Sequence, residues 1–287
     1  VVSNPGFLRG GSAVADFLRP DRVVVGSDDR AAALDTAELY SSLNAPIMIT
    51  DPASAETIKY ASNAFLATKL SFINAVAAVC EAVGADVADV VTGMGYDTRI
   101  GREFLRPGPG WGGSCFPKDT LAMVRIAADA GYDFGLLKGV VEVNDQQFDR
   151  VVDKIRRGVA GPLEGATVAL WGLTFKARTD DLRDSPALEV AERLSKAGAK
   201  VVAYDPTVEP GRSDPSLESV QVTATALEAV TGADVLAVMT EWDQFRWVDL
   251  GEVAEAMSGA TVIDGRNLLN PTDVRAAGLR YDGIGRS

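Results

Sequence analysis

After residue 161 the chain alternates short apolar strands with amphipathic helices, and this alternation restricts the fold more than any other feature. Strands that alternate with helices across short turns form a parallel sheet with helices on both faces. We therefore predict a Rossmann-like α/β domain over residues 161–287. Its expected strands are 166–173, 200–206, 234–240 and 260–267, and its expected helices are 185–198, 225–233 and 248–257.

Residues 54–83 carry apolar side chains at helical spacing, without an internal Pro or Gly. This pattern predicts a helix about 45 Å long, with Ser54 as its N-cap and Gly84 as its stop. A helix so apolar indicates a central spine between domains or a dimer interface. Further helices are expected at 86–93, 118–130 and 134–157, so residues 53–160 are predicted to form a helical middle domain.

The first 52 residues contain one expected strand at 22–27, a helix at 29–43 and a second strand at 45–51. A strand–helix–strand unit of this size buries too little surface to be stable alone. We therefore expect residues 1–52 to be the C-terminal remnant of a larger parallel-sheet domain. A small appendage packed on the rest of the chain is the alternative.

Composition excludes several classes of function. The net charge is −12, which argues against nucleic acid and anionic membranes as partners, and no apolar run or leader typical of membrane insertion is expected. The chain contains no histidine, so it has neither a Ser-His-Asp triad nor a His-ligated metal site, and no metal is expected. Only two cysteines are present, which favours a reducing, cytoplasmic compartment.

The most informative motif is GWGGSCFPKD at residues 110–119. Pro117 suits the first turn of the following helix, which puts Cys115 at that helix's N-terminus. Backbone N–H groups and the nearby Lys118 ammonium both favour a thiolate there. The motif is equally consistent with a simple capping turn. Cys80, inside the long apolar helix, is expected to be a core residue.

Other polar residues lie where a ligand could bind. Lys59 and Asn63 share one helix face, and by spacing alone they are typical of a solvated surface pair. The loop 171–186 and Arg266 follow predicted strands, so they should meet at the carboxyl edge of the sheet, where ligands bind in such folds. The loop lacks the GxGxxG fingerprint, and Asp205 suits either a ribose hydroxyl or a local turn.

Together these segments resemble the nucleotide-sugar 6-dehydrogenases of the UDP-glucose/GDP-mannose dehydrogenase family. The resemblance extends over nearly the whole chain in the family's order, and Phe116 favours UDP-glucose as the substrate. The matching strings are NPGFLRGGSAVADFLRPDRVVVG, KYASNAFLATKLSFINAV, GYDTRIG, GWGGSCFPKD, GLTFKARTDDLRDSP and IDGRN.

The resemblance implies an NAD-binding domain of which residues 1–52 are the remnant, a central dimerisation and catalytic domain at 53–160, and a UDP-sugar-binding domain at 161–287. It implies a homodimer through the 54–83 helix, in which Arg99 reaches the substrate of the neighbouring subunit. The implied catalytic residues are Cys115, Lys59, Asn63 and Asp119. The implied substrate contacts are Phe7, Leu8, Lys59, Asn63, Arg99, Phe104, Leu105, Arg106, Gly108, Trp111, Gly112, Phe175, Lys176 and Arg266, and the implied NAD contacts are Lys118 and Arg183.

The implied reaction is the NAD-dependent four-electron oxidation of UDP-glucose to UDP-glucuronate through a thiohemiacetal and a thioester on Cys115. One departure affects it: Gly6 and Gly10 stand where the family pattern NPEFLxEG has glutamates. Two alternatives stay open. One is a non-catalytic module that binds nucleotide sugar or forms dimers, and the other is a dehydrogenase for a different nucleotide sugar.

Overall fold

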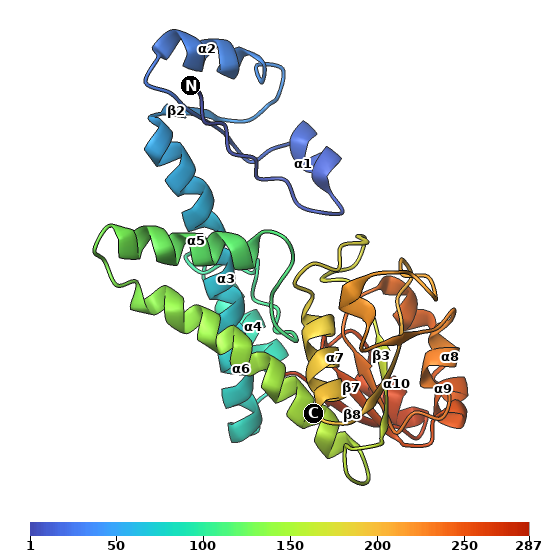
Figure 1. The fold of residues 1–287 in the computed structure, drawn as a ribbon. Coiled ribbons are helices and arrows are strands. Elements are labelled where there is room, and N and C mark those ends of the chain that lie inside the picture. Colours follow the sequence, from blue (N-terminus) through green and yellow to red (C-terminus); the bar gives the residue numbers. More distant parts are fainter. Residues whose placement is uncertain (287) are drawn as a thin grey trace. The chain divides into compact units, whose positions relative to one another are not determined.

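The computed structural model describes residues 1–286 and separates into two compact units. Unit 1 comprises Val1–Leu66 and Lys118–Asp133, and unit 2 comprises Ala67–Pro117 and the described chain from Phe134 onward. The predicted fold class is confirmed: parallel sheets, a long helix, a helical middle region and part of an N-terminal α/β domain are all present (Figure 1). The division at residues 52 and 160 stays a prediction.

Unit 2 contains a six-stranded sheet in the order β5-β4-β3-β6-β7-β8, and every pairing in it is parallel. The sheet starts at its centre, because β3 pairs with β4 on one side and with β6 on the other. After β3 and its neighbours on one side, the chain adds the next strands on the other side. In such folds this change of side creates a crevice at the carboxyl ends of the strands, and ligands bind there. The strands are β3 (Thr167–Trp171), β4 (Lys200–Tyr204), β5 (Gln221–Val222), β6 (Val235–Val238), β7 (Thr261–Asp264) and β8 (Arg280–Gly283).

Alternate side chains of these strands enter two separate cores, one on each face of the sheet. Val168 and Leu170 pack with α6 (Gly135–Gly158) and α7 (Pro186–Lys196), whereas Ala169 and Trp171 pack on the opposite face. Figure 1 shows α7 on one side of the sheet and α8 and α9 on the other. The helices of that second face are α8 (Ala226–Val230), α9 (Leu250–Ala256) and α10 (Pro271–Ala276).

The long helix α3 (Pro52–Val83) agrees closely with its prediction. Its start differs, because the carboxylate of Asp51 accepts the Ser54 N–H at 2.8 Å and therefore caps the helix in place of Ser54. Gly84 ends it with a positive φ of 73°. Within unit 2 the helix places Cys80 in the core, as predicted, and it is followed by α4 (Val87–Gly95).

By length and composition alone, α3 is long and apolar enough to cross a membrane, so the expectation that no segment reaches that length is wrong. A core helix of a soluble protein passes the same test. A third of its most apolar 18-residue window is buried. In unit 2 two of its polar side chains make hydrogen bonds to backbone carbonyls of the same unit. Ser71 donates to the Val140 carbonyl at 2.7 Å, and Lys69 donates to the Ile100 carbonyl at 3.1 Å.

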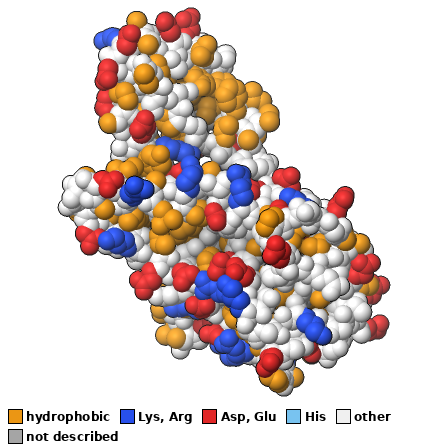
Figure 2. Space-filling model, viewed as in Figure 1, with side chains coloured by type: hydrophobic (Ala, Val, Ile, Leu, Met, Phe, Trp, Pro, Cys, Tyr) orange, Lys and Arg blue, Asp and Glu red, His pale blue; other side chains and the backbone are white. Residues whose placement is uncertain are grey.

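Unit 1 contains only two parallel strands, β1 (Val23–Gly26) and β2 (Ile47–Thr50), with α2 (Arg30–Glu38) packed against them. The short helix α1 (Ala13–Leu18) was not predicted and buries none of its residues. Val14, Phe17 and Leu18 on it are exposed, and Figure 2 shows their hydrophobic patch. Such exposure is typical of part of a larger parallel-sheet domain, which is normally covered on both faces. Most of α5 (Phe116–Asp129) also belongs to this unit.

Asp205 ties together the loops at the carboxyl edge of the unit 2 sheet. It is 1% exposed, and its Oδ2 accepts the backbone N–H groups of Leu173 and Thr174 at 2.8 and 3.1 Å. The same oxygen accepts the indole N–H of Trp242 at 3.1 Å, and Oδ1 accepts from Thr207. Both carboxylate oxygens of Asp205 therefore accept hydrogen bonds from the protein itself. Of the two roles considered from the sequence, the structure favours the local structural role over a contact with a ribose.

We expect Asp205→Ala to destabilise unit 2 by about 3 kcal/mol, because several buried donors lose their acceptor at once. Thermal unfolding followed by circular dichroism measures the effect. Glu209→Ala, at an exposed position of the same loop, is the matched control and should unfold with the wild type. Equal melting of the two variants would contradict the role given to Asp205.

Candidate functional site

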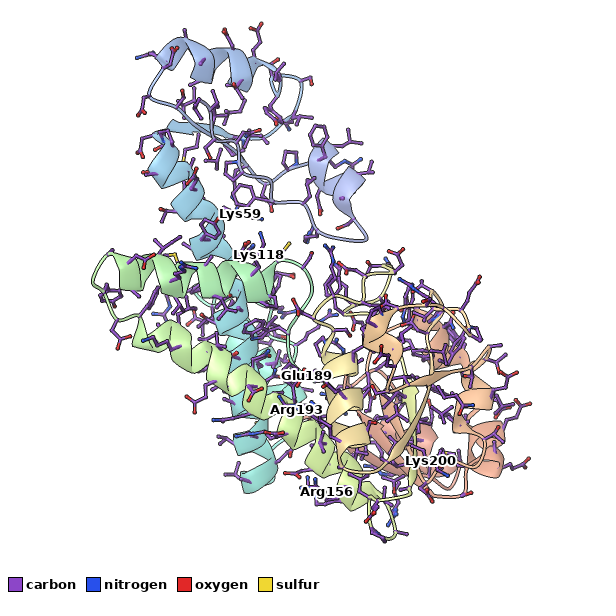
Figure 3. All side chains as sticks on the ribbon, viewed as in Figure 1. Lys59, Lys118, Arg156, Glu189, Arg193 and Lys200 are labelled. Carbon is purple, nitrogen blue, oxygen red and sulfur yellow. The ribbon has the colours of Figure 1, made fainter. Side chains whose placement is uncertain are left out.

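In unit 1 a buried hydrogen bond joins two of the predicted catalytic residues. The Asn63 side chain on α3 donates to Asp119 Oδ2 on α5 at 2.6 Å, and the two residues are only 8% and 2% exposed. The expectation of a solvated pair is therefore wrong for Asn63. The Lys118 ammonium lies 3.1 Å from Asp119 Oδ1, so both carboxylate oxygens face a donor. Figure 3 shows Lys59 on α3 and Lys118 at the start of α5.

Lys59, the third predicted polar residue of this unit, lies beside Phe7. Its ammonium is 5.4 Å from the centre of the Phe7 ring, and the Arg22 guanidinium is 3.7 Å from the same centre. Two cations therefore contact one aromatic ring, which favours a fixed ring position. Sequence reasoning did not single out Arg22. Its position next to a buried strand gave it no distinguishing pattern.

A cavity of about 210 Å³ opens beside this ring in unit 1. Its walls include Gly6, Phe7, Leu8 and Arg22. A Cβ atom built at Gly6 meets no other atom within 4 Å, so a larger side chain fits at this position. The glutamate expected from the family pattern would thus be sterically acceptable here.

In unit 2 the predicted substrate loop, residues 104–112, has no helix or strand of its own, and neither has Gly113, which follows it. Buried polar side chains of α3 and α6 hold its backbone instead. Asn74 accepts the Gly108 N–H at 2.8 Å, and Gln147 donates to the Gly108 carbonyl at 2.8 Å. Asn144 accepts the Trp111 N–H and donates to the Trp111 carbonyl, at 2.8 and 3.0 Å.

Two aromatic contacts anchor the same loop next to the cysteine. The Phe116 ring lies 6.3 Å from the Phe104 ring and 6.5 Å from the Trp111 ring, both between centroids. The Trp111 indole donates to Ser71 at 2.8 Å. Cys115 itself is exposed, and its sulfur lies 3.6 Å from the Ser114 hydroxyl. The thiol at the start of α5 is therefore accessible, as a nucleophile requires.

At the carboxyl edge of the unit 2 sheet, Arg266 joins three predicted segments. Its Nε donates to the Met239 carbonyl at 2.8 Å, and its Nη2 donates to the Phe175 carbonyl at 3.2 Å. A Cβ at Gly108 would be 3.2 Å from Arg266 Nη1, which brings the substrate loop to the guanidinium. This arrangement gathers Gly108, Phe175 and Arg266 in one place. For the 171–186 loop and Arg266 the sequence predicted such a meeting at the sheet edge, whereas it did not place Gly108 there.

The turn that carries Arg266 is fixed by its neighbour Asp264. Asp264 accepts the Leu269 N–H at 2.7 Å and the Arg266 N–H at 3.2 Å. Burial raises the pKa of the Asp264 carboxyl, while these backbone N–H groups oppose that shift. The carboxylate of Glu241 adds negative charge 3.1 Å from Arg266 Nε. Glu241 Oε2 is buried, and within residues 1–286 it has no hydrogen-bond partner of good geometry.

The remaining predicted site residues have varied surroundings. Arg99 is exposed and pairs with Asp97 at 2.5 Å, which raises the pKa of Arg99. Leu8 and Arg106 are exposed, whereas Leu105 is 1% exposed and belongs to the core. The Lys176 ammonium lies 5.5 Å from the Phe175 ring centre. These residues keep their assignments as predictions.

One further cluster, between α6 and α7, lies next to the predicted substrate loop. Arg193 on α7 pairs with Glu189 at 2.8 Å and, across to α6, with Asp145 and Asp149 at 2.5 and 2.6 Å (Figure 3). It also lies over the ring of Phe148, which would be 2.5 Å from a Cβ at Gly110.

The residues that hold the loop had one signal in the sequence. Ser71 and Asn74, like Asn144 and Gln147, are polar pairs three residues apart within helices.

Comparison with known proteins identifies three matching domain families in chain order. Residues 1–44 match the NAD binding domain of the UDP-glucose/GDP-mannose dehydrogenase family. Residues 53–146 match its central domain, and residues 169–271 match its UDP binding domain.

Similar proteins cover the whole chain. UDP-glucose 6-dehydrogenase TuaD of Bacillus subtilis is 46% identical over 286 residues, which is 100% of this chain and 62% of the relative. UDP-glucose 6-dehydrogenase of Rhizobium meliloti is 45% identical over 100% of this chain and 66% of its own length. A UDP-glucose dehydrogenase structure from Pyrobaculum islandicum superposes with a TM-score of 0.88 at 36% identity, over 100% of this chain and 64% of that one. The chain thus spans less than two thirds of these relatives.

We expect Asn144→Ala to loosen the substrate loop, because the Trp111 backbone loses both of its hydrogen bonds to the side chain. Amide hydrogen exchange across residues 104–113 should accelerate at least tenfold, corresponding to about 1.4 kcal/mol. Gln146→Ala, on the exposed face of the same helix, is the control and should leave exchange unchanged. Unchanged protection in Asn144→Ala would show that the amide does not hold the loop.

Proposed function

Because the chain belongs to the UDP-glucose/GDP-mannose dehydrogenase family, we propose that it supplies the substrate site and covalent catalyst for oxidation of UDP-glucose to UDP-glucuronate. The observation that carries this proposal is the accessible Cys115 at the start of α5, directly after the anchored substrate loop. The relatives named above support UDP-glucose as the substrate, because proteins named UDP-glucose 6-dehydrogenase are 45–46% identical to this chain.

Cys115 explains how one carbon loses four electrons in two steps. Loss of a hydride and a proton from the sugar CH₂OH gives an aldehyde, and the Cys115 thiolate adds to its carbonyl carbon to form a thiohemiacetal. Loss of a second hydride and a proton gives a thioester. Water then attacks the thioester, so that the carboxylate forms and the thiol is released. When bound, NAD⁺ would supply the hydride-accepting capacity that both oxidations need.

In unit 1 the buried pair of Asn63 and Asp119 and the half-buried Lys59 suit the proton and charge movements of this sequence. Lys59 is proposed to stabilise the oxyanion of the sugar or to move its proton, with Asn63 as a second donor. Asp119 holds the Asn63 amide at 2.6 Å and is proposed to orient the hydrolytic water. The hydrogen bond fixes the direction of the Asn63 amide, as a preorganised donor requires.

The nucleotide sugar is proposed to bind in unit 2 along the anchored loop and the sheet edge. Arg266 and Lys176 supply positive charge for the diphosphate, and the ring of Phe175 supplies an apolar wall. Phe104, Leu105, Arg106, Gly108, Trp111 and Gly112 are the proposed loop contacts. For Phe7 and Leu8, and for Arg99 of a second subunit, the family resemblance is the support for a substrate contact.

The residues of this chain fit only part of an NAD site. Lys118 and Arg183 are exposed cations suited to phosphate groups. Residues 1–52 contain no GxGxxG turn, and GPGWGG at 108–113 follows a helical region and not a strand. The cofactor would therefore need groups beyond those of this chain.

Gly6 is the point at which this chain departs from the proposed reaction sequence. A glycine can neither take a proton nor position water, although the cavity beside it leaves room for a carboxylate. Gly10 likewise has no carboxylate. We therefore propose that the chemistry stalls at or before thioester hydrolysis even when an NAD-binding segment completes the protein.

The test is to join this chain to the NAD-binding segment of a relative and add UDP-glucose and NAD⁺. We expect a covalent sugar adduct on Cys115 by mass spectrometry, because the last step lacks its base. Gly6→Glu should remove the adduct and give two NADH per sugar. Cys115→Ala is the control and should carry no adduct.

Other outcomes separate the alternatives. Normal turnover without an adduct would refute the proposed stall. Binding of UDP-glucose without any NADH would support a non-catalytic binding module. Adduct formation with a different nucleotide sugar, but not with UDP-glucose, would change the substrate assigned to this protein.

We also propose a reducing, cytoplasmic location, and the free thiols of Cys80 and Cys115 support it.

We further propose that the protein is a homodimer through α3. In unit 2 the helix exposes Phe72, Val79 and Val83 by 52, 59 and 71%, at spacings of seven and four residues. Such a stripe is typical of a helix that packs on another helix.

Replacing Phe72 and Val79 together by Glu should convert a dimer into a monomer, because two like charges would enter an apolar contact. Light scattering after size exclusion measures the mass. Trp247→Glu, at an 83% exposed position outside α3, is the control and should keep the wild-type mass. A monomeric wild type would overturn the homodimer.

A further inference from the structure

The turn after β7 carries Arg266 and is followed at once by Asn267, the last residue of the IDGRN motif. Asn267 has a positive φ of 49°, in the left-handed region that asparagine adopts more readily than most other residues. Its Nδ2 donates to the Ile284 carbonyl at 2.9 Å, and its Oδ1 accepts the Ile284 N–H at 3.0 Å. One side chain therefore pairs with both backbone groups of one residue, as a neighbouring strand would.

The end of β8 leaves room for this contact. A Cβ at Gly283, the last residue of β8, would be only 2.4 Å from Asn267 Oδ1. Any larger residue there would displace the asparagine side chain or the backbone that it holds. The approach of the two segments is therefore close and specific.

The segment that follows β8 is itself fixed to the helices α3 and α4. Ile284 is 2% exposed and belongs to the core cluster that also contains Ala77 and Val87. The Gly285 N–H donates to Glu81 Oε1 at 2.7 Å, and the Gly285 carbonyl accepts the Val87 N–H at 2.9 Å. A Cβ at Gly285 would be 2.7 Å from Val87 and 2.8 Å from Ala77, so the segment lies directly on these helices.

We propose that Asn267 is a positioning residue for Arg266, and that its two hydrogen bonds to Ile284 hold the arginine turn in register with α3 and α4. The guanidinium has its own partners, because Nε donates to the Met239 carbonyl and Nη2 donates to the Phe175 carbonyl. These contacts direct the guanidinium only while the turn that carries it stays in place.

Asp264 fixes the same turn from its other end. Its carboxylate accepts the N–H groups of Arg266 and Leu269, so it ties the turn to the end of β7. Asn267 differs from Asp264, because its partner Ile284 lies 17 residues further along the chain. The turn thus has one local anchor and one distant anchor, and the distant anchor relates it to the middle helices.

The catalytic meaning of this role rests on the proposed function, in which Arg266 supplies positive charge to the diphosphate of the nucleotide sugar. A guanidinium presents its donors in a planar fork, so its hydrogen bonds to phosphate depend on its orientation. A displaced turn would therefore weaken nucleotide-sugar binding, although no group that touches the ligand had changed.

The first measurement needs no ligand. Nuclear magnetic resonance follows the exchange with water of the Arg266 Nε–H proton in the full chain, and Arg266→Lys identifies the signal by its loss. Asn267→Gly keeps the left-handed backbone but loses both hydrogen bonds, so we expect exchange about threefold faster than in the wild type. Asn267→Asp keeps the acceptor for the Ile284 N–H and should lie between the two.

Asn270→Gly is the matched control. Asn270 is exposed and caps α10, where its side chain accepts the Thr272 N–H at 2.9 Å. Glycine is also tolerated as an N-cap, so this variant should fold and exchange as the wild type does. Unchanged exchange of the Arg266 proton in Asn267→Gly overturns the proposal, as does an equal acceleration in Asn270→Gly.

The second measurement is the Kd for UDP-glucose, by isothermal titration calorimetry, in the wild type, Asn267→Gly, Arg266→Gln and the double variant. Because Asn267 acts through Arg266, Asn267→Gly should weaken binding about tenfold in the wild type but less than about twofold in Arg266→Gln. An equal loss in both backgrounds would reveal a general effect on unit 2 and overturn the proposal. A wild type that does not bind UDP-glucose refutes the proposed substrate site, whereas the exchange measurement still decides the role of Asn267.

Discussion

The buried hydrogen bonds between helix side chains and the backbone of residues 104–113 are the constraint on which the substrate site depends. A loop without secondary structure cannot pair its own N–H and C=O groups, and leaving them unpaired inside a protein costs about 1–3 kcal/mol each. Asn74, Asn144 and Gln147 supply those partners. The loop is therefore held by side chains of α3 and α6, and the cysteine follows shortly after its end.

Ion pairs then hold the helices in place against the unit 2 sheet. Arg193 joins α7 to two carboxylates of α6. These carboxylates lie close in sequence to Asn144 and Gln147, which hold the loop. At the other end of α6, buried Lys154 pairs with Glu81 of α3 at 2.9 Å and with Asp282 of β8 at 2.7 Å. Removing one partner of such a buried group costs much more than a surface pair contributes. The middle helices and the sheet are thus joined at two separate points.

Much of the fold could be predicted from the sequence because its segments follow simple periodicities. The long helix, four of the six strands of the unit 2 sheet and α7 were expected close to where they occur. The strands β5 and β8 were missed because β5 has only two residues and β8, RYDG, carries charge and no apolar run. Asn63 was misjudged because burial of a polar residue depends on distant partners that no local pattern reveals. For the same reason the sequence left two roles open for Asp205.

The proposed role of Cys115 has to be met in a chain without histidine. Imidazole normally supplies both a proton acceptor and a positive charge, and neither is available from that side chain here. The start of α5 supplies backbone N–H groups next to the cysteine. These groups carry partial positive charge, but they cannot accept a proton. In the proposed reaction the base for hydrolysis would therefore come from another side chain, and Gly6 occupies the position where the family pattern would place a carboxylate.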